Sequence, residues 1–164
     1  MVRVLGRIFA AKPSPMSIPQ IGAPAPAFEA PDQHGTLHRL QDYAGRKVAL
    51  YFYPKDDTSG CTAQACDLRD NYQSLQAAGI QVLGVSIDSE KSHQKFAQKY
   101  DLPFPLLVDE NKKLVEAYGV WQEKSMYGRK YMGTMRYTFL IDERGLIEKV
   151  ITKVDTKNHA AQLL

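Results

Sequence analysis

Cysteine is scarce in this sequence, which holds two cysteines, Cys61 and Cys66, among 164 residues. Two thiols are too few for the disulfide framework that holds small secreted domains together. Long apolar runs are absent as well, since no stretch approaches the roughly 18 residues that a membrane-spanning helix needs. We therefore expect a cytoplasmic protein that binds no membrane. Any disulfide in it is expected to form during a reaction rather than to stabilise the fold.

Phosphate-binding motifs and basic surface stripes are also missing. Gly128 and Gly133 belong to no GxxxxGK[ST] or GxGxxG pattern. The net charge of +3 comes from the first 15 residues, which hold three basic residues and no acid, whereas the other 149 residues hold 18 basic and 18 acidic side chains. Because no basic stripe alternates with aromatic residues, the sequence argues against nucleic-acid binding.

The N-terminal segment "MVRVLGRIFAAKPSP" is short, basic and free of acids. A targeting segment is one interpretation, although Gly6 and Arg7 interrupt its apolar stretch. The alternatives are a disordered tail or a protein that starts at Met16. We expect residues 1–16 to be an extension, disordered or targeting, and residues 17–164 to form one folded domain.

Strand-like and helix-like patterns alternate along the domain. Pro54 stops an apolar run, Gly79 follows a run with helical spacing, Ser89 opens another helix and Pro103 ends it. The expected elements are strands at 47–54, 80–88 and 105–109, helices around 65–75, 89–102 and 110–119, a loop at 120–134, and a hairpin of strands at 136–142 and 146–154. This order predicts an α/β fold, a thioredoxin-like three-layer sandwich with a mixed central β-sheet.

Cys61 is the candidate reactive thiol, because it follows a strand and a turn at the point where a helix begins. The first N–H groups of a helix lack intrahelical partners, and the helix dipole is positive at that end. Both features favour a thiolate, which is the nucleophilic form of cysteine. An inert core cysteine is the alternative, but a helix start flanked by a turn is a poor place to bury a thiol.

Cys66 lies five residues further along the same expected helix. In an ideal helix, residues i and i+5 have Cα atoms about 8.6 Å apart. A disulfide needs a Cα separation below about 7 Å. The two thiols therefore cannot form a bridge while the helix is intact, and we predict that its first turns unwind when they do. Cys66 as an inert core residue remains the alternative.

Other chemistry near these cysteines is less well supported. A metal site would need further ligands, such as His34 and His38, from distant parts of the chain. The CxxxxC spacing differs from the CxxC of disulfide reductases and isomerases. The adjacent acids Asp56 and Asp57 fit a turn better than a facing acid–base pair.

The segment "YPKDDTSGCTAQAC" resembles the active site of peroxiredoxins, whose pattern Pro-x-x-x-Thr/Ser-x-x-Cys is met by Pro54, Thr58 and Cys61. A second cysteine at plus five resembles the Q-type subfamily, the bacterioferritin comigratory proteins. The segments "GAPAPAFEAPDQHG", "VLGVSID" and "GVWQEKSMYGRKYMGTMRYTFLID" extend the resemblance across residues 17–164. Ser59 departs from the proline often found there, which loosens the turn but removes no catalytic group.

The resemblance implies a role for each of five residues. Cys61 resembles the peroxidatic cysteine, Cys66 the resolving cysteine, and Thr58 the residue whose hydroxyl contacts thiolate and peroxide. Pro54 resembles the proline that shields the pocket, and Arg136 the arginine that supports the thiolate. Fixed donors of this kind suit a transition state that spreads negative charge over sulfur and oxygen. From the residues alone, Thr58 could cap the helix, Pro54 end a strand, and Arg136 lie on the surface.

The resemblance further implies a thiol peroxidase that reduces hydrogen peroxide or alkyl hydroperoxides. It implies thioredoxin as the reductant, a monomer, and no metal, flavin or haem cofactor. A thioredoxin-like disulfide reductase and a catalytically silent binding or chaperone module are the alternatives. Trp121 and the tyrosines within 127–137 are expected in the core rather than along the substrate entrance.

Overall fold

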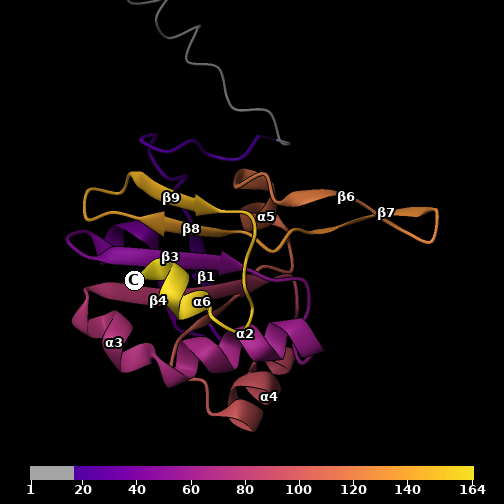
Figure 1. Cartoon of the computed structure of the whole chain (residues 1–164), viewed down its shortest axis with the longest axis horizontal. Helices are drawn as coiled ribbons and strands as arrows, with labels where there is room; N and C mark the ends of the chain where they lie inside the picture. The colour runs from indigo at the N-terminus through magenta and orange to yellow at the C-terminus, as the bar shows by residue number, and fades with distance from the viewer. Residues whose placement is uncertain (1–16) are drawn as a thin grey trace, which may run out of the picture.

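The computed structural model describes residues 17–164, so the expectation for residues 1–16 lies outside the described residues. A five-stranded sheet forms the centre, in the order β5-β4-β3-β8-β9 (Figure 1). Its strands are β3 (Lys47–Phe52), β4 (Ile80–Ser86), β5 (Leu106–Val108), β8 (Thr138–Ile141) and β9 (Ile147–Ile151). β3, β4 and β5 are parallel, whereas β8 runs antiparallel to both β3 and β9. The predicted mixed sheet is therefore confirmed.

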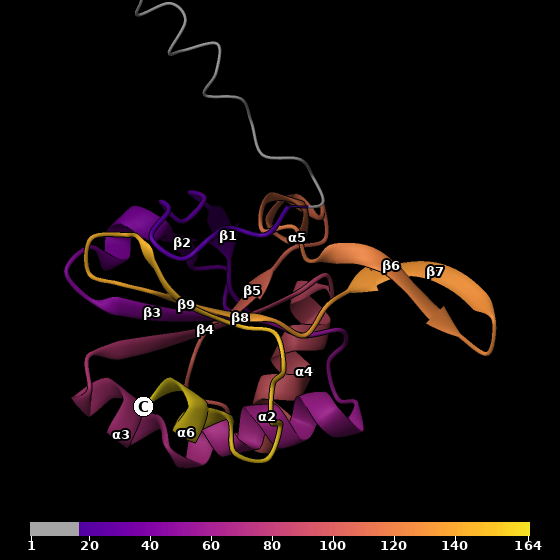
Figure 2. The ribbon, with the colours of Figure 1, turned by 45° about the horizontal axis from the view of Figure 1, so that its top comes forward.

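Helices cover both faces of this sheet. They are η1 (Leu40–Tyr43), α2 (Ser59–Asp70), α3 (Tyr72–Ala77), α4 (Glu90–Tyr100), α5 (Lys113–Ala117) and α6 (His159–Leu163). Figure 2 shows α2, α3 and α6 below the sheet and α5 above it. A short hairpin of β1 (Glu29–Pro31) and β2 (Leu37–Arg39), which the sequence analysis did not predict, lies on the α5 side. The three-layer α/β sandwich is thus confirmed.

Alternate residues of β3 enter two separate cores. Leu50 and Phe52 pack with α5 residues on one face, while Tyr51 and Cys61 belong to the cluster formed with α2, α3, α4 and α6. Because both faces of β3 are buried, the strand reads as a continuous apolar run rather than an alternating one. Among residues 17–164, no helix is long and apolar enough to cross a membrane.

The helix expected around 65–75 is interrupted, so a single continuous helix is a wrong prediction. Asn71 separates α2 from α3, and its side-chain amide donates to the carbonyl of Asp67 at 2.8 Å. Asparagine side chains compete in this way with the helical backbone pattern. Gly79, which follows α3, has φ of 78°, as expected for a residue beyond a helix C-terminus.

The predicted loop at 120–134 is also wrong, because this segment forms a hairpin of β6 (Trp121–Met126) and β7 (Arg129–Thr134). Its two turn residues, Tyr127 and Gly128, have φ of 51° and 79°. Positive φ at both central residues defines the turn that suits the twist of a two-residue hairpin. The hairpin projects from the body of the molecule (Figure 1).

Candidate active site

Cys61 lies in the first turn of α2 as a free thiol, where the sequence analysis expected it. Its burial differs from the expectation, because the residue is only 1% exposed and packs beneath the sheet. A thiolate removed from water in this way is costly unless fixed donors compensate for its lost hydration. The N–H groups of the first helical turn are such donors.

Cys66 is a half-buried free thiol on the same uninterrupted helix. The i, i+5 spacing in an intact helix keeps the two Cα atoms beyond the reach of a disulfide. The structure therefore shows the reduced arrangement on which the unwinding prediction depends. The unwinding itself stays a prediction.

Arg136 lies against the first turn of α2 rather than on the open surface. Its Nη1 donates a hydrogen bond of 2.9 Å to Oε1 of Gln64, which is fully buried. A Cβ atom at Gly60 would lie 3.1 Å from Arg136 Nη2, so the missing side chain makes room for the guanidinium. Within residues 17–164, no carboxylate pairs with Arg136. A full positive charge is thus held beside the residue that precedes Cys61.

Thr58 occupies the N-cap position of α2, but its side chain makes no capping hydrogen bond. Its Oγ1 instead donates to the carbonyl of Lys55 at 2.9 Å. The capping alternative is therefore wrong for this side chain. The oxygen lone pairs have no partner within the described chain, so they can accept a hydrogen bond from a bound molecule. Pro54 is half-buried and lies two residues beyond the end of β3.

Asp56 does more than form a turn, since its buried carboxylate holds the loop that carries Thr58. It accepts hydrogen bonds from Tyr53 Oη at 2.6 Å, and from Ser92 Oγ at 2.8 Å. His93 Nδ1 lies 2.7 Å from the same carboxylate, and His93 Nε2 lies 2.8 Å from the Leu107 carbonyl.

The environment of His93 favours its protonated form. Both ring nitrogens face acceptors, and only an imidazolium donates from both. Burial alone lowers the pKa of His93, but the hydrogen bond and charge of Asp56 outweigh it, so the pKa is raised. The result is a buried ion pair between the loop and α4.

Asp57 provides a second connection between this loop and α4. It accepts hydrogen bonds from Lys99 Nζ at 2.8 Å and from Tyr100 Oη at 3.0 Å. Its φ of 58° lies in the left-handed region, which aspartate tolerates better than most residues. Two adjacent acids therefore fix the loop that carries Thr58 to a neighbouring helix.

The side chains that could bind a metal already form hydrogen bonds with one another and with their neighbours. Oxygen and nitrogen atoms of Asp56, Asp88 and His93 lie within 4.8 Å of each other. Asp88 accepts from the Asp56 N–H and from Ser86 Oγ, so the cluster is satisfied by its own hydrogen bonds. His38, an alternative ligand from the sequence analysis, instead contacts Asp32 at 2.7 Å and a tyrosine hydroxyl at 2.6 Å.

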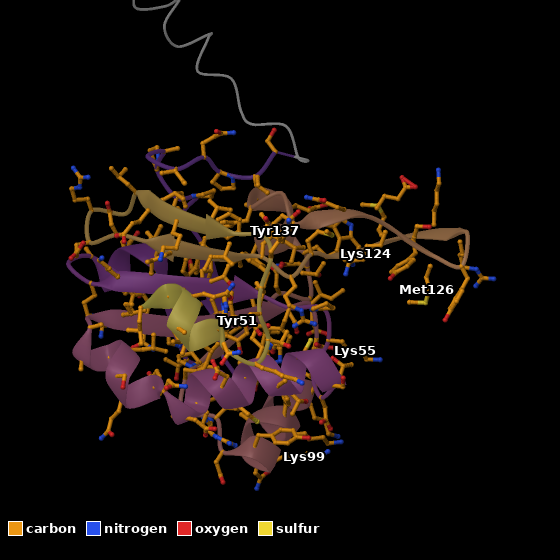
Figure 3. All side chains as sticks on the ribbon, viewed as in Figure 1. Tyr51, Lys55, Lys99, Lys124, Met126 and Tyr137 are labelled. Carbon is orange, nitrogen blue, oxygen red and sulfur yellow. The ribbon has the colours of Figure 1, made fainter. Side chains whose placement is uncertain are left out.

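Three residues of the candidate site escaped the sequence analysis: Tyr51 and Gln64 near Cys61, and His93, which contacts Asp56. Tyr51 comes from β3 and lies between the sheet and the helices below it (Figure 3). Its buried hydroxyl has no partner among the described residues, and burial, together with the charge of Cys61, raises its pKa well above the usual value. Gln64 and His93 complete the set. A polar residue three positions after Cys61 was the one available signal, since i and i+3 share a helix face.

The aromatic residues of the hairpin and of the segment that follows it divide into two groups. Trp121 and Tyr137 are half-buried and pack against the sheet, as expected. Tyr127 and Tyr131 are exposed, so placing them in the core was wrong.

Comparison with known proteins identifies the group to which this chain belongs. Residues 21–150 match the model of the AhpC/TSA family. The chain belongs to the AhpC/TSA family. Peroxiredoxin Bcp of Bacillus subtilis is 48% identical over 145 residues, 88% of this chain and 92% of that protein. Peroxiredoxin Bcp of Escherichia coli is 49% identical over 135 residues, 82% of this chain and 86% of that protein.

A solved structure shows the same fold. Bacterioferritin comigratory protein of Xanthomonas campestris, described for its alkyl peroxide reduction activity, has a TM-score of 0.78 and 37% identity. The match covers 83% of this chain and 87% of that chain. The resemblance to Bcp or Q-type peroxiredoxins is therefore confirmed, as is the thioredoxin-like fold. This peroxiredoxin is a thiol peroxidase. The comparisons therefore support neither of the two alternatives, the disulfide reductase and the silent binding module.

Proposed function

We propose that Cys61 is the peroxidatic residue of this peroxiredoxin and that Cys66 resolves its oxidised form. The observation that carries the proposal is the placement of the Arg136 guanidinium against Gly60, directly before Cys61. A cation held against residue 60 and the N–H groups of the first turn of α2 therefore lie at the same helix end as the buried Cys61 thiol. This combination stabilises an anion on sulfur and the charge that develops during its reaction.

The chemistry begins with attack of the Cys61 thiolate on one oxygen of a peroxide. The S–O bond forms while the O–O bond breaks, which yields a sulfenic acid and hydroxide or alkoxide. Arg136 donates to the developing negative charge, and its tether to Gln64 limits its movement. Thr58 accepts a hydrogen bond from the peroxide, since its own proton is directed to Lys55. Pro54 shields this approach from bulk water.

Resolution follows when the Cys66 sulfur attacks the sulfenic acid. A disulfide forms and water leaves, with one proton supplied by the Cys66 thiol. The helical spacing requires the first turns of α2 to unwind before this step. Because both thiols come from one chain, the cycle needs no second subunit, and we infer a monomer.

An external dithiol then reduces the disulfide by thiol–disulfide exchange. By family, we propose thioredoxin as this reductant and the cytoplasm as its compartment, since disulfides are readily returned to thiols there. The activity described for the Xanthomonas campestris relative supports organic hydroperoxides as substrates besides hydrogen peroxide.

Cysteine variants test the assignment. Cys61→Ser is expected to abolish peroxide consumption in the presence of thioredoxin and its reductase. Cys66→Ser is expected to consume one equivalent and to leave a sulfenic acid that dimedone traps at residue 61. Retained turnover in Cys61→Ser, with an unchanged fold by circular dichroism, would contradict the proposal. An assay of insulin disulfide reduction without peroxide distinguishes the reductase alternative.

A further inference from the structure

The two faces of the β6–β7 hairpin each carry a lysine, and only one of these lysines lies on the side of the active site. Strand alternation and register place Lys124 and Tyr131 on one face, and Ser125 and Lys130 on the other. Lys124 is half-buried, whereas the side chain of Lys130 is 77% exposed. In Figure 3 Lys124 lies near the body of the molecule, on the side of the hairpin where the loop of Lys55 lies.

The direction of the Lys124 side chain follows from its contact with Gly133. A Cβ atom at Gly133 would lie 3.1 Å from Lys124 Cδ and 3.3 Å from Cε, so the lysine stem crosses this glycine. Gly133 pairs with Gln122 and is therefore nearer the base of the hairpin than Tyr131, the partner of Lys124. The lysine stem thus runs toward the base of the hairpin, and Arg136 follows Gly133 by three residues.

The charge of Lys124 has no acidic partner within residues 17–164. Its neighbour Glu123 points to the other face and pairs with Lys130 at 3.9 Å. Burial and the nearby Arg136 lower the pKa of Lys124, while the negative charge of Cys61 opposes that shift. Arg136 and Cys61 are therefore the charged groups that act on this ammonium, whose stem crosses Gly133 toward the base of the hairpin.

Two neighbouring cations without a carboxylate are unfavourable unless an anion lies between them. Arg136 has only the neutral Gln64 as a side-chain partner, and Lys124 has none in the described structure. An anion is what the peroxidase reaction provides, first on sulfur and then on the leaving oxygen. The unneutralised pair therefore fits a site made for negative charge.

We propose that Lys124 is the second cation of the peroxide site, which stabilises the Cys61 thiolate and the charge on the leaving oxygen together with Arg136. The inference rests on the proposed role of Cys61. Lys124 acts through its electric field. The S–O bond forms, the O–O bond breaks, and the leaving hydroxide or alkoxide takes its proton from solvent.

Three variants test this inference. Lys124→Met removes the charge and retains the stem that crosses Gly133, whereas Lys124→Arg retains the charge. Lys130→Met makes the same change on the opposite face of the hairpin and serves as the matched control. The readout is the second-order rate constant for oxidation of the reduced enzyme by hydrogen peroxide, measured by stopped flow from pH 5 to 9.

Lys124→Met is expected to lower the rate constant about tenfold or more and to move the pH–rate profile to higher pH. Lys124→Arg is expected to restore most of the rate, and Lys130→Met to stay within about twofold of wild type. Thermal unfolding verifies that each variant folds, and Lys124→Gln replaces any methionine variant that does not.

Equal rates in Lys124→Met and Lys130→Met would overturn the inference. A loss that Lys124→Arg does not restore, with an unchanged pH profile, would show a packing role and overturn it as well. Failure of the proposed function is distinct, because the wild-type enzyme itself would then not react with peroxide.

Discussion

The Arg136 guanidinium lies so close to Gly60 that a Cβ atom added to this glycine would be 3.1 Å from Arg136 Nη2. This separation is shorter than an ordinary van der Waals contact, so a side chain at residue 60 requires the guanidinium to shift by a few tenths of an ångström. The backbone of Gly60 is helical, with no positive φ that would itself require glycine. The glycine is therefore explained by space for the arginine and not by backbone conformation.

Gly60→Ala is predicted to separate stability from activity. Alanine is favoured over glycine within a helix by about 0.5–1 kcal/mol, so the free energy of unfolding should stay unchanged or rise. The rate of peroxide reduction should fall about tenfold, because Arg136 shifts from its position against Gly60, the residue that precedes Cys61. Urea unfolding and stopped-flow kinetics measure the two effects. Ser59→Ala, one residue earlier and exposed, is the control and should keep full activity. Full activity in Gly60→Ala would contradict the placement of the guanidinium.

Gln64→Leu is predicted to weaken catalysis through Arg136. The variant removes the acceptor of the 2.9 Å hydrogen bond from the guanidinium, and also an amide nitrogen that has no partner in the described structure. Because that nitrogen is buried without a partner, the net loss of stability should stay near 1 kcal/mol. The peroxide rate constant should fall severalfold, and Gln64→Glu, which retains an acceptor, should preserve more of it. Equal rates in Gln64→Leu and wild type would show that the tether is dispensable.

Tyr51→Phe and Tyr53→Phe form a matched pair in which the outcomes should differ. The hydroxyl of Tyr51 is buried without a partner, whereas that of Tyr53 donates to Asp56 at 2.6 Å. Removing an unpartnered buried hydroxyl should leave stability unchanged or raise it by up to about 1 kcal/mol. Removing the Tyr53 hydroxyl should cost about 1–3 kcal/mol, since Asp56 then loses a donor. Chemical denaturation compares the two, and a larger loss in Tyr51→Phe would indicate a partner for its hydroxyl.

The His93–Asp56 pair is predicted to make stability depend on pH. The pKa of His93 is raised in the folded state, so its contribution is fully present below the unfolded value of about 6.5. The contribution is lost as the pH rises through the higher folded value. The difference in unfolding free energy between wild type and His93→Leu should therefore be larger at pH 5.5 than at pH 8.5.

His159 provides the control with the opposite sign. Burial lowers the pKa of His159, so protonation at low pH destabilises the folded state. Relative to His159→Asn, the wild type should therefore lose stability as the pH falls below about 6.5. If both histidine variants showed the same pH trend, the protonated state assigned to His93 would be wrong.

The parts of the fold that sequence could predict are those set by local patterns. Apolar runs gave the parallel strands, Pro54 followed the end of β3, and Ser89 was correctly expected to open a helix. Ser89 Oγ accepts from the N–H of Ser92 at 3.1 Å, as an N-cap residue should. The β6–β7 hairpin was missed because its turn places Tyr127 at positive φ, where asparagine or glycine is the usual signal.

The site shows the same division between local and distant contacts. The position of Cys61 at a helix start is local, and it was predicted. The contact of Arg136 with Gln64 joins residues 72 apart, and that of His93 with Asp56 joins residues 37 apart. Such contacts depend on how the strands and helices pack, which no spacing in a single sequence reports. The family resemblance pointed to Arg136, but neither Gln64 nor His93 had a comparable signal.

The central claim is that Cys61 and Cys66 form one redox unit within a single chain. The fully reduced protein should be mixed with one equivalent of hydrogen peroxide, and its free thiols and intact mass should then be measured. We predict that both thiols disappear within seconds and that the monomer mass falls by about 2 Da, the mass of two hydrogen atoms. Unchanged thiols and an unchanged mass would contradict the account.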